Sequence, residues 1–193
     1  MSRSIDLLKK RYLENIKEKP DLFVGIELEY PVINLEGKAT DSEVVKDLFR
    51  YLPSVLGFTI EKVDDFGNPI QLLYPVSQDT ILFEVSYTTI EFAFGRAESI
   101  QEVEVRFRDY MDLIQKKLSK ANHAIIGSGI HPYWDKNDNQ PVAYARYQML
   151  MNYLKLSRTV LGTDLHDYPE YGAFICGSQV QLDVSKSNYL RVI

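Results

Sequence analysis

Glu27 and Glu29, two residues apart, are the first pair in the chain whose type and spacing allow metal chemistry. They lie within residues 22–34, where apolar and polar side chains alternate with the period of two that is typical of a strand. Both carboxylates are therefore expected on one strand face, roughly 6 to 7 Å apart. Mg²⁺ prefers oxygen ligands of this kind, so the pair predicts half of a magnesium site. The alternative is a solvated strand face.

Glu84 and Glu91 form a second acidic pair, and both are flanked by apolar residues. Their separation of seven is odd, so one regular strand would send them to opposite faces. They converge only if a turn or bulge interrupts the strand, and residues 87–89 are where we expect it. An unpaired charge in apolar surroundings is costly, which favours a bound cation. The alternative is a structural ion pair between Glu91 and Arg96.

A row of polar side chains, Gln179, Gln181 and Asp183, occupies alternate positions of residues 173–184, which we expect to form the last strand. Amide side chains both donate and accept hydrogen bonds, so the row suits a polar ligand, with an exposed polar face as the alternative. Arg146 offers a guanidinium that suits bidentate binding of a substrate carboxylate, or a surface ion pair. We expect the row to share one concave face with Glu27 and Glu29.

Other catalytic chemistry is sparse in this sequence. It has no glycine-rich phosphate loop of the Walker or dinucleotide type and no Gly-x-Ser-x-Gly elbow. Cys176 is the single cysteine and lies in an apolar run, so we expect a small buried side chain and no internal disulfide. His131 precedes a proline and is expected to be a hydrogen-bonded turn residue.

The elements that must position these residues follow from hydrophobic periodicity. Helical spacing of apolar residues predicts helices over residues 4–18, 40–56, 100–120 and 144–155. Thr40 and Ser99 each precede a glutamate by three residues, which predicts that each caps a helix. Short β-rich runs predict strands over residues 59–63, 70–74, 80–85, 89–94 and 124–126. The strands alternate and their connections are short, so the predicted fold class is α+β, with an antiparallel sheet and helices packed mainly on one face.

Length and composition exclude several classes of protein. The chain has 193 residues, a net charge of −5 and no composition shift, so we expect residues 1–193 to form a single domain. No segment gathers the basic residues needed to follow a phosphate backbone, which argues against nucleic acid as a partner. No apolar run is long enough for a signal peptide or a membrane span, so we expect a soluble cytoplasmic protein without membrane association.

Five segments, taken in order, resemble the glutamate–cysteine ligases (γ-glutamylcysteine synthetases) and the related carboxylate–amine ligases that share the glutamine synthetase fold. The segments are residues 25–30, 83–92, 129–132, 145–149 and 177–183. The resemblance implies a curved antiparallel sheet whose acidic face holds Mg²⁺ and the phosphates of ATP. It implies four metal-binding carboxylates, namely Glu27, Glu29, Glu84 and Glu91. It implies substrate or nucleotide contacts at Arg146, Gln179 and Gln181.

The activity implied by the resemblance is the ATP-dependent joining of the glutamate γ-carboxylate to the amino group of cysteine, the first step of glutathione biosynthesis. The carboxylate is phosphorylated and the amine attacks the acyl phosphate, so no protein nucleophile is needed. Three alternatives stay open: a related ligase with another amine acceptor, a non-catalytic fragment or pseudoenzyme that binds an amino acid or a partner, and a metal-dependent phosphohydrolase. Catalytic domains of this family are longer, so we expect an N-terminal part of a larger catalytic domain whose nucleotide site is incomplete; the oligomeric state stays open.

Overall fold

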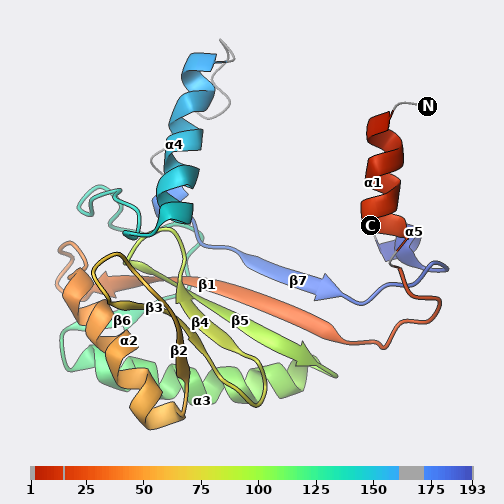
Figure 1. The fold of residues 1–193 in the computed structure, drawn as a ribbon. Coiled ribbons are helices and arrows are strands. Elements are labelled where there is room, and N and C mark those ends of the chain that lie inside the picture. The colour runs from red at the N-terminus through yellow and green to blue at the C-terminus, as the bar shows by residue number, and fades with distance from the viewer. Residues whose placement is uncertain (1–2, 15, 161–171, 193) are drawn as a thin grey trace.

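The computed structural model describes residues 3–14, 16–160 and 172–192. Seven strands of this described part form an open sheet in the order β2-β3-β4-β5-β1-β6, and β7 also pairs with β1 (Figure 1). All of these pairings are antiparallel. The strands are β1 (Val24–Asn34), β2 (Thr59–Val63), β3 (Pro69–Leu73), β4 (Thr80–Phe83), β5 (Thr89–Ala97), β6 (His123–Ile125) and β7 (Ser178–Leu182).

Helices lie on both sides of the sheet, but they pack along only one of its two faces (Figure 1). They are α1 (Arg3–Leu13), α2 (Ser42–Leu56), α3 (Ile100–Ser119), α4 (Ala145–Val160) and α5 (Tyr189–Val192). Helices α2 and α3 pack along one face, whereas α4 rises from the opposite side and α1 stands apart with α5 (Figure 1). Helix α1 has no buried residue. The core lies mainly between α2, α3 and the sheet, and α4 adds the buried side chains of Tyr147 and Met151.

Aromatic side chains fill the space between the sheet and the two packed helices. Phe49 of α2 stacks on Phe83 of β4, with ring centroids 4.0 Å apart. Phe107 of α3 contacts Tyr30 of β1 and Phe92 of β5, with centroids 5.8 and 5.6 Å away. Because side chains alternate along a strand, placing Tyr30 against α3 turns the odd positions of β1 to the uncovered face.

Strand β1 is the centre of the sheet and carries the first acidic pair. Along one edge it pairs with β5 from Val24 to Pro31. Its other edge is divided, because β7 pairs with residues 24–28 and β6 with residues 32–34. The acidic half of β1 is thus enclosed between β5 and β7.

One of the two expected helix caps is confirmed and the other is wrong. The Ser99 hydroxyl accepts a hydrogen bond from the Glu102 N–H and caps α3. Helix α2 is capped by Asp41, whose carboxylate accepts from the Glu43 N–H, and not by Thr40. The Thr40 hydroxyl is buried and donates instead to the Val32 carbonyl oxygen at 2.5 Å. The sequence pattern assigned the Thr40 side chain to the helix cap, but this side chain bonds to a tertiary partner on β1 instead.

Several expected boundaries differ from the structure. Helix α1 ends at Leu13 and β4 ends at Phe83, both earlier than the periodicity indicated. The expected strand over residues 173–184 is reduced to β7, since Ile175 pairs with Ile130 before the chain reaches β1. Along β7 the side chains of Val180 and Leu182 are 61% and 55% exposed, because neither α2 nor α3 extends beneath this strand.

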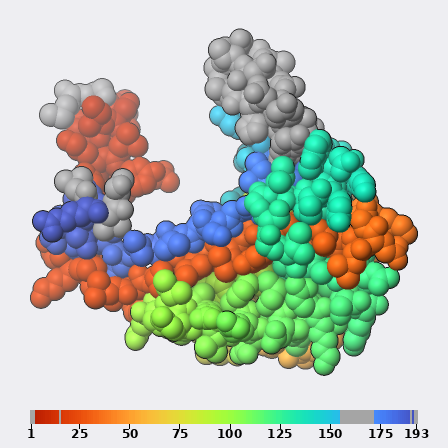
Figure 2. All heavy atoms as spheres, turned by 180° about the vertical axis from the view of Figure 1, so that it is seen from behind, coloured from red at the N-terminus to blue at the C-terminus, as the bar shows by residue number. Residues whose placement is uncertain are grey.

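The α+β class, the antiparallel sheet and the packing of helices mainly on one face are as predicted. Seen from behind, β7 runs along the floor of a hollow that lies between α1 and the side of the molecule that carries α4 (Figure 2). In the part of the chain described, every helix is too short or too polar to cross a membrane.

Candidate metal centre

Three carboxylates converge on the uncovered face of the sheet. One oxygen each of Glu29, Glu84 and Glu91 lies within 4.8 Å of the others. Glu29 and Glu91 are direct cross-strand partners on β1 and β5, so their side chains leave the sheet on the same face. Glu84 joins them from the connection between β4 and β5. We call these three residues the acidic cluster.

The sharp connection between β4 and β5 brings Glu84 to Glu91. After Phe83 the chain turns, and the Glu84 N–H donates to the Thr89 carbonyl oxygen at 3.2 Å. Residues 84–88 thus separate two strands, and Glu84 does not follow the alternation of β5. This is the interruption that the odd spacing of the two glutamates required, although it begins earlier than residues 87–89.

The charges of the acidic cluster are poorly compensated. Glu91 is only 9% exposed, and burial raises its pKa to about 8, with further increases from its hydrogen bond to Glu84 and from the charges of Glu84, Glu27 and Glu29. Burial also raises the pKa of Glu84, against the hydrogen bond with Glu91 and the nearby Arg146 charge. Burial and mutual repulsion thus favour a protonated carboxyl group in this pair. A bound cation would replace that proton.

The alternative of a structural ion pair between Glu91 and Arg96 is wrong. Arg96 is exposed, and its guanidinium carbon lies 5.3 Å from the centroid of the Phe23 ring. Among the described residues Arg96 forms no ion pair with Glu91. The strand register is irregular between Val24 and Ile26, at the end of β5 that carries Arg96.

The second part of the acidic face is formed by β1 and β7. Glu27 pairs with Gln179 and Gly25 with Gln181, so the two amides lie on the same face as the glutamates. The Gln181 Nε2 donates to Glu27 Oε1 at 2.9 Å. A Cβ at Gly25 would lie 2.9 Å from Gln181 Oε1, which shows that the missing side chain leaves room for this amide.

Glu29 has a backbone partner that the sequence did not reveal. The Gly177 N–H donates to Glu29 Oε2 at 2.7 Å. Residues 174–176, which come just before Gly177, pair with residues 129–131. The His131 N–H donates to the Phe174 carbonyl oxygen, and the Cys176 N–H donates to the Gly129 carbonyl oxygen. The glycine-rich segments at 127–129 and 177 were visible in the sequence, but their mutual pairing was not.

Arg146 and Asp183 lie at opposite ends of the acidic face. Arg146 is exposed in the first turn of α4, close enough to Glu84 for its charge to lower the Glu84 pKa. Asp183 lies beyond β7, where it is 3.6 Å from Lys17 Nζ and accepts from the Asp21 N–H. Its N–H donates to the Phe23 carbonyl oxygen and continues the pairing of β7 with β1, while its carboxylate is occupied by Lys17 and the Asp21 N–H.

The two other residues considered for chemistry are structural. Cys176 is buried, and burial raises the pKa of its thiol to about 12, with Glu29 and Glu84 adding to the increase. His131 is fully buried, and its Nδ1 accepts from the Tyr133 N–H while its Nε2 contacts the Val32 carbonyl oxygen. Burial lowers the His131 pKa. Neither residue is a ready nucleophile or base.

The acidic cluster has the donor chemistry that a divalent cation requires, and its oxygens are close to the required spacing. Octahedral Mg²⁺ with oxygen ligands at about 2.1 Å places those oxygens about 3 to 4 Å apart. The three oxygens lie within 4.8 Å of one another, so a small contraction would bring them into a coordination sphere. Partial burial and the raised pKa values of Glu84 and Glu91 both favour a bound positive charge at this point.

Comparison with known proteins agrees with the geometry. Residues 23–190 match the family model for glutamate-cysteine ligase family 2 (GCS2), which is well over half of the chain. The match spans the whole acidic face, from Glu27 on β1 to Gln181 on β7. A search of curated proteins gave no match.

Proposed function

The chain belongs to glutamate-cysteine ligase family 2, and from this premise we propose that it forms the acidic face of an ATP-dependent carboxylate–amine ligase. The proposed reaction joins the γ-carboxylate of glutamate to the amino group of cysteine, in the cytoplasm, as the first step of glutathione biosynthesis. Glutamate, cysteine and ATP are the proposed substrates, and Mg²⁺ is the proposed metal.

The observation that carries this proposal is the convergence of Glu29, Glu84 and Glu91 on one partly buried point. A carboxylate is a poor electrophile, so forming an amide requires its prior activation as an acyl phosphate. Phosphoryl transfer depends on positioning and on neutralising negative charge, with little covalent chemistry left for the protein. When bound, Mg²⁺ supplies that neutralisation at the phosphates.

Each residue of the acidic face has a proposed task within this scheme. Glu29, Glu84 and Glu91 hold the metal, and the Gly177 N–H fixes one oxygen of Glu29. Glu27 is oriented by Gln181 and extends the carboxylate row toward β7. Arg146 offers a bidentate donor to an anionic substrate group beside Glu84, and Gln179 is placed next to Glu27 for a polar substrate group.

A protein nucleophile is not part of the proposed mechanism, which agrees with the state of Cys176. Its thiol is buried and has a pKa raised to about 12, so it carries almost no thiolate at neutral pH. The amine of the second substrate attacks the activated carboxyl carbon, and phosphate leaves. The exposed, polar surface around Gln179 and Gln181 is compatible with a water-soluble amino acid.

The test is ADP release by the full-length protein with glutamate, Mg²⁺ and a panel of amines. We expect turnover that requires glutamate, an amine and the metal together, with cysteine as the best acceptor. Another preferred amine would reassign the reaction to a related carboxylate–amine ligase. Phosphate release without an amine would support the phosphohydrolase alternative, and metal-dependent ATP binding without turnover would support a pseudoenzyme.

A further inference from the structure

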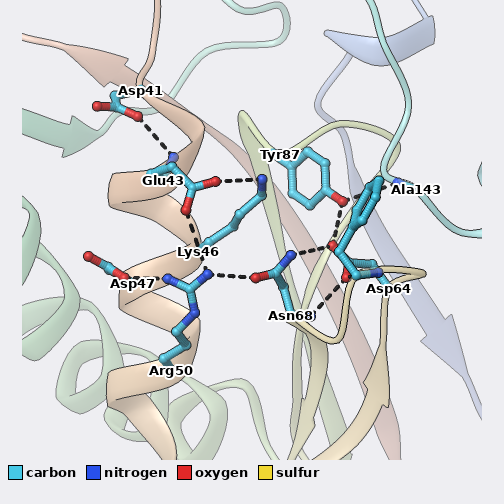
Figure 3. A network of polar contacts seen from close by, with 10 residues as sticks. Asp41, Glu43, Lys46, Asp47, Arg50, Asp64, Asn68, Tyr87 and Ala143 are labelled. Atoms are coloured by element: carbon cyan, nitrogen blue, oxygen red, sulfur yellow. Dashed lines mark hydrogen bonds and ion pairs between the residues drawn. The ribbon is translucent and has the colours of Figure 1, made fainter.

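The hydroxyl of Tyr87 joins two segments that carry residues of the acidic face. It donates to Asp64 Oδ2 at 2.7 Å and accepts from the Ala143 N–H at 3.1 Å (Figure 3). Tyr87 belongs to the β4–β5 connection that begins with Glu84, and Ala143 lies three residues before Arg146. One side chain thus connects the Glu84 loop, the start of α4 and the β2–β3 turn.

The β2–β3 turn is a firm anchor for this connection. Asp64 is 4% exposed, and its Oδ1 accepts from the N–H groups of Phe66 and Asn68. The Asn68 Nδ2 donates to Asp64 Oδ2 at 2.8 Å. The Asn68 Oδ1 in turn accepts from Arg50 Nη2, which fastens the turn to α2 (Figure 3). Asp64 is therefore held by its own turn and, through Asn68 and Arg50, by α2.

Two further hydrogen bonds run between the same segments and bracket Glu84. The Val142 N–H donates to the Val85 carbonyl oxygen at 2.8 Å. The buried hydroxyl of Tyr147 donates to the Phe83 carbonyl oxygen at 2.7 Å. The residues immediately before and after Glu84 are therefore both held by the segment that carries Arg146.

We infer that Tyr87 is a positioning residue that, through Asp64 and Ala143, sets the place of Arg146 relative to Glu84. The inference rests on the proposed function, because Arg146 is taken to bind the anionic group of the amino acid substrate. Tyr87 touches no reacting group itself. Its loss should weaken capture of glutamate while the metal-binding carboxylates of β1 and β5 keep their places.

The direct test is Tyr87→Phe in the full-length protein, with Tyr74→Phe as the matched control. The phenylalanine keeps the ring packing on Phe83 and the contact with Lys46, whose Nζ lies 4.3 Å from the ring centroid. Tyr74 is half-buried against Phe58, so the control also removes only a hydroxyl. Asp64→Asn breaks the same connection from the other side, because an amide nitrogen in place of Oδ2 cannot accept the hydrogen bonds from Tyr87 and Asn68.

For Tyr87→Phe and Asp64→Asn we expect the KM for glutamate to rise by about tenfold, as loss of a positioning hydrogen bond allows. The kcat, the KM for ATP and the affinity for Mn²⁺ should stay within about threefold of wild type. Tyr74→Phe should change none of these. An equal loss of metal, ATP and glutamate binding would mean general loosening and would overturn the assignment, as would a glutamate KM unchanged in both variants.

Amide hydrogen exchange separates this inference from the proposed function. In Tyr87→Phe we expect faster exchange at Ala143 and through residues 142–147, with the β1–β7 amides unchanged. Unchanged protection of Ala143 would overturn the inference even if the protein is a ligase. A wild-type protein that shows no ligase turnover would instead overturn the proposed function, and the exchange result would still decide whether Tyr87 fixes the segment.

Discussion

Two buried carboxylate sites in this molecule have opposite surroundings. Asp79 is 1% exposed and accepts hydrogen bonds from Arg106 Nη1, Tyr110 Oη, Ser77 Oγ and the Gly95 N–H, all between 2.6 and 2.8 Å. Glu91 is 9% exposed, and its nearest charged neighbours are other carboxylates. A buried carboxylate with hydrogen-bond donors and a cationic partner stabilises the fold. A buried carboxylate that lacks both needs a compensating positive charge from outside the chain.

The largest expected difference between the two sites is in catalysis. Glu91→Gln removes a proposed metal-binding carboxylate but keeps its shape, so we expect ADP release by the full-length protein to fall by about 10³-fold, or about 4 kcal/mol. The melting temperature without metal should be unchanged or higher, because the substitution also removes carboxylate repulsion. Arg96→Ala is the control and should change neither quantity much. A large fall in melting temperature with activity retained would contradict the metal assignment.

Asp79→Asn should have the opposite effect to Glu91→Gln, with a loss of stability and no change in metal binding. It leaves the Arg106 guanidinium, whose side chain is 16% exposed, without its close counter-charge, so the free energy of unfolding should fall by about 3 kcal/mol. Urea unfolding measures this loss, and Mn²⁺ affinity should not change. Glu102→Gln is the matched control, because Glu102 lies 3.6 Å from Arg106 at an exposed position and should contribute less than about 0.5 kcal/mol. An equal loss of stability in Asp79→Asn and Glu102→Gln would contradict the structural role of Asp79.

The pH dependence of stability sharpens the comparison further. Burial raises the Glu91 pKa from its ordinary value of 4.5 to about 8, so the folded state holds this proton more tightly than the unfolded state. The resulting stabilisation is complete below pH 4.5 and is lost as the pH rises through 8. Between pH 5 and 8, with EDTA present, we expect the wild type to lose about 2 to 3 kcal/mol more than Glu91→Gln.

Added Mn²⁺ should reverse this trend, because a cation favours the ionised carboxyl groups. Urea unfolding of both proteins across the pH range, with and without the metal, measures the effect. Parallel pH profiles for wild type and Glu91→Gln would show that protonation of Glu91 has no part in stability.

The smallest expected effect lies at the margin of the acidic face. In Gly25→Ala the new Cβ would meet Gln181 Oε1, the mobile end of a side chain, so the amide can move away from Glu27. We expect a loss of about threefold in kcat/KM and a stability change below about 1 kcal/mol. Gly127→Ala is the control, since its Cβ would meet no atom within 4 Å. A loss of activity equal to that of Glu91→Gln would mean that Gln181 belongs to the centre of the site.

Local patterns were sufficient to predict the part of the site that lies on regular strands. Alternation along β1 placed Glu27 and Glu29 on one face, and the odd spacing of Glu84 and Glu91 required a break between them. Alternation likewise placed Gln179 and Gln181 on one face of their strand, although their pairing with β1 came only from the structure. In each case the relevant information lay within about ten residues of sequence.

Contacts that depend on distant segments were not predictable in this way. The Gly177 N–H reaches Glu29, Tyr87 reaches Asp64, and Thr40 turns inward to Val32 instead of capping α2. Arg96 was a reasonable partner for Glu91 by sequence proximity, yet it lies over Phe23. Tertiary packing chooses among partners that local periodicity leaves equivalent.

The edge of β1 that is divided between β7 and β6 has a consequence for the order in which the strands assemble during synthesis. The hydrogen bond from Gly177 to Glu29 spans 148 residues, and among the described strands β7 is synthesised last. At synthesis rates of about 5 to 20 residues per second, Glu29 precedes its partner by roughly 7 to 30 s. During that interval β5 can already pair with β1, and β7 then completes the acidic face on a preformed edge. The acidic face is thus completed after the strand pairing that supports it.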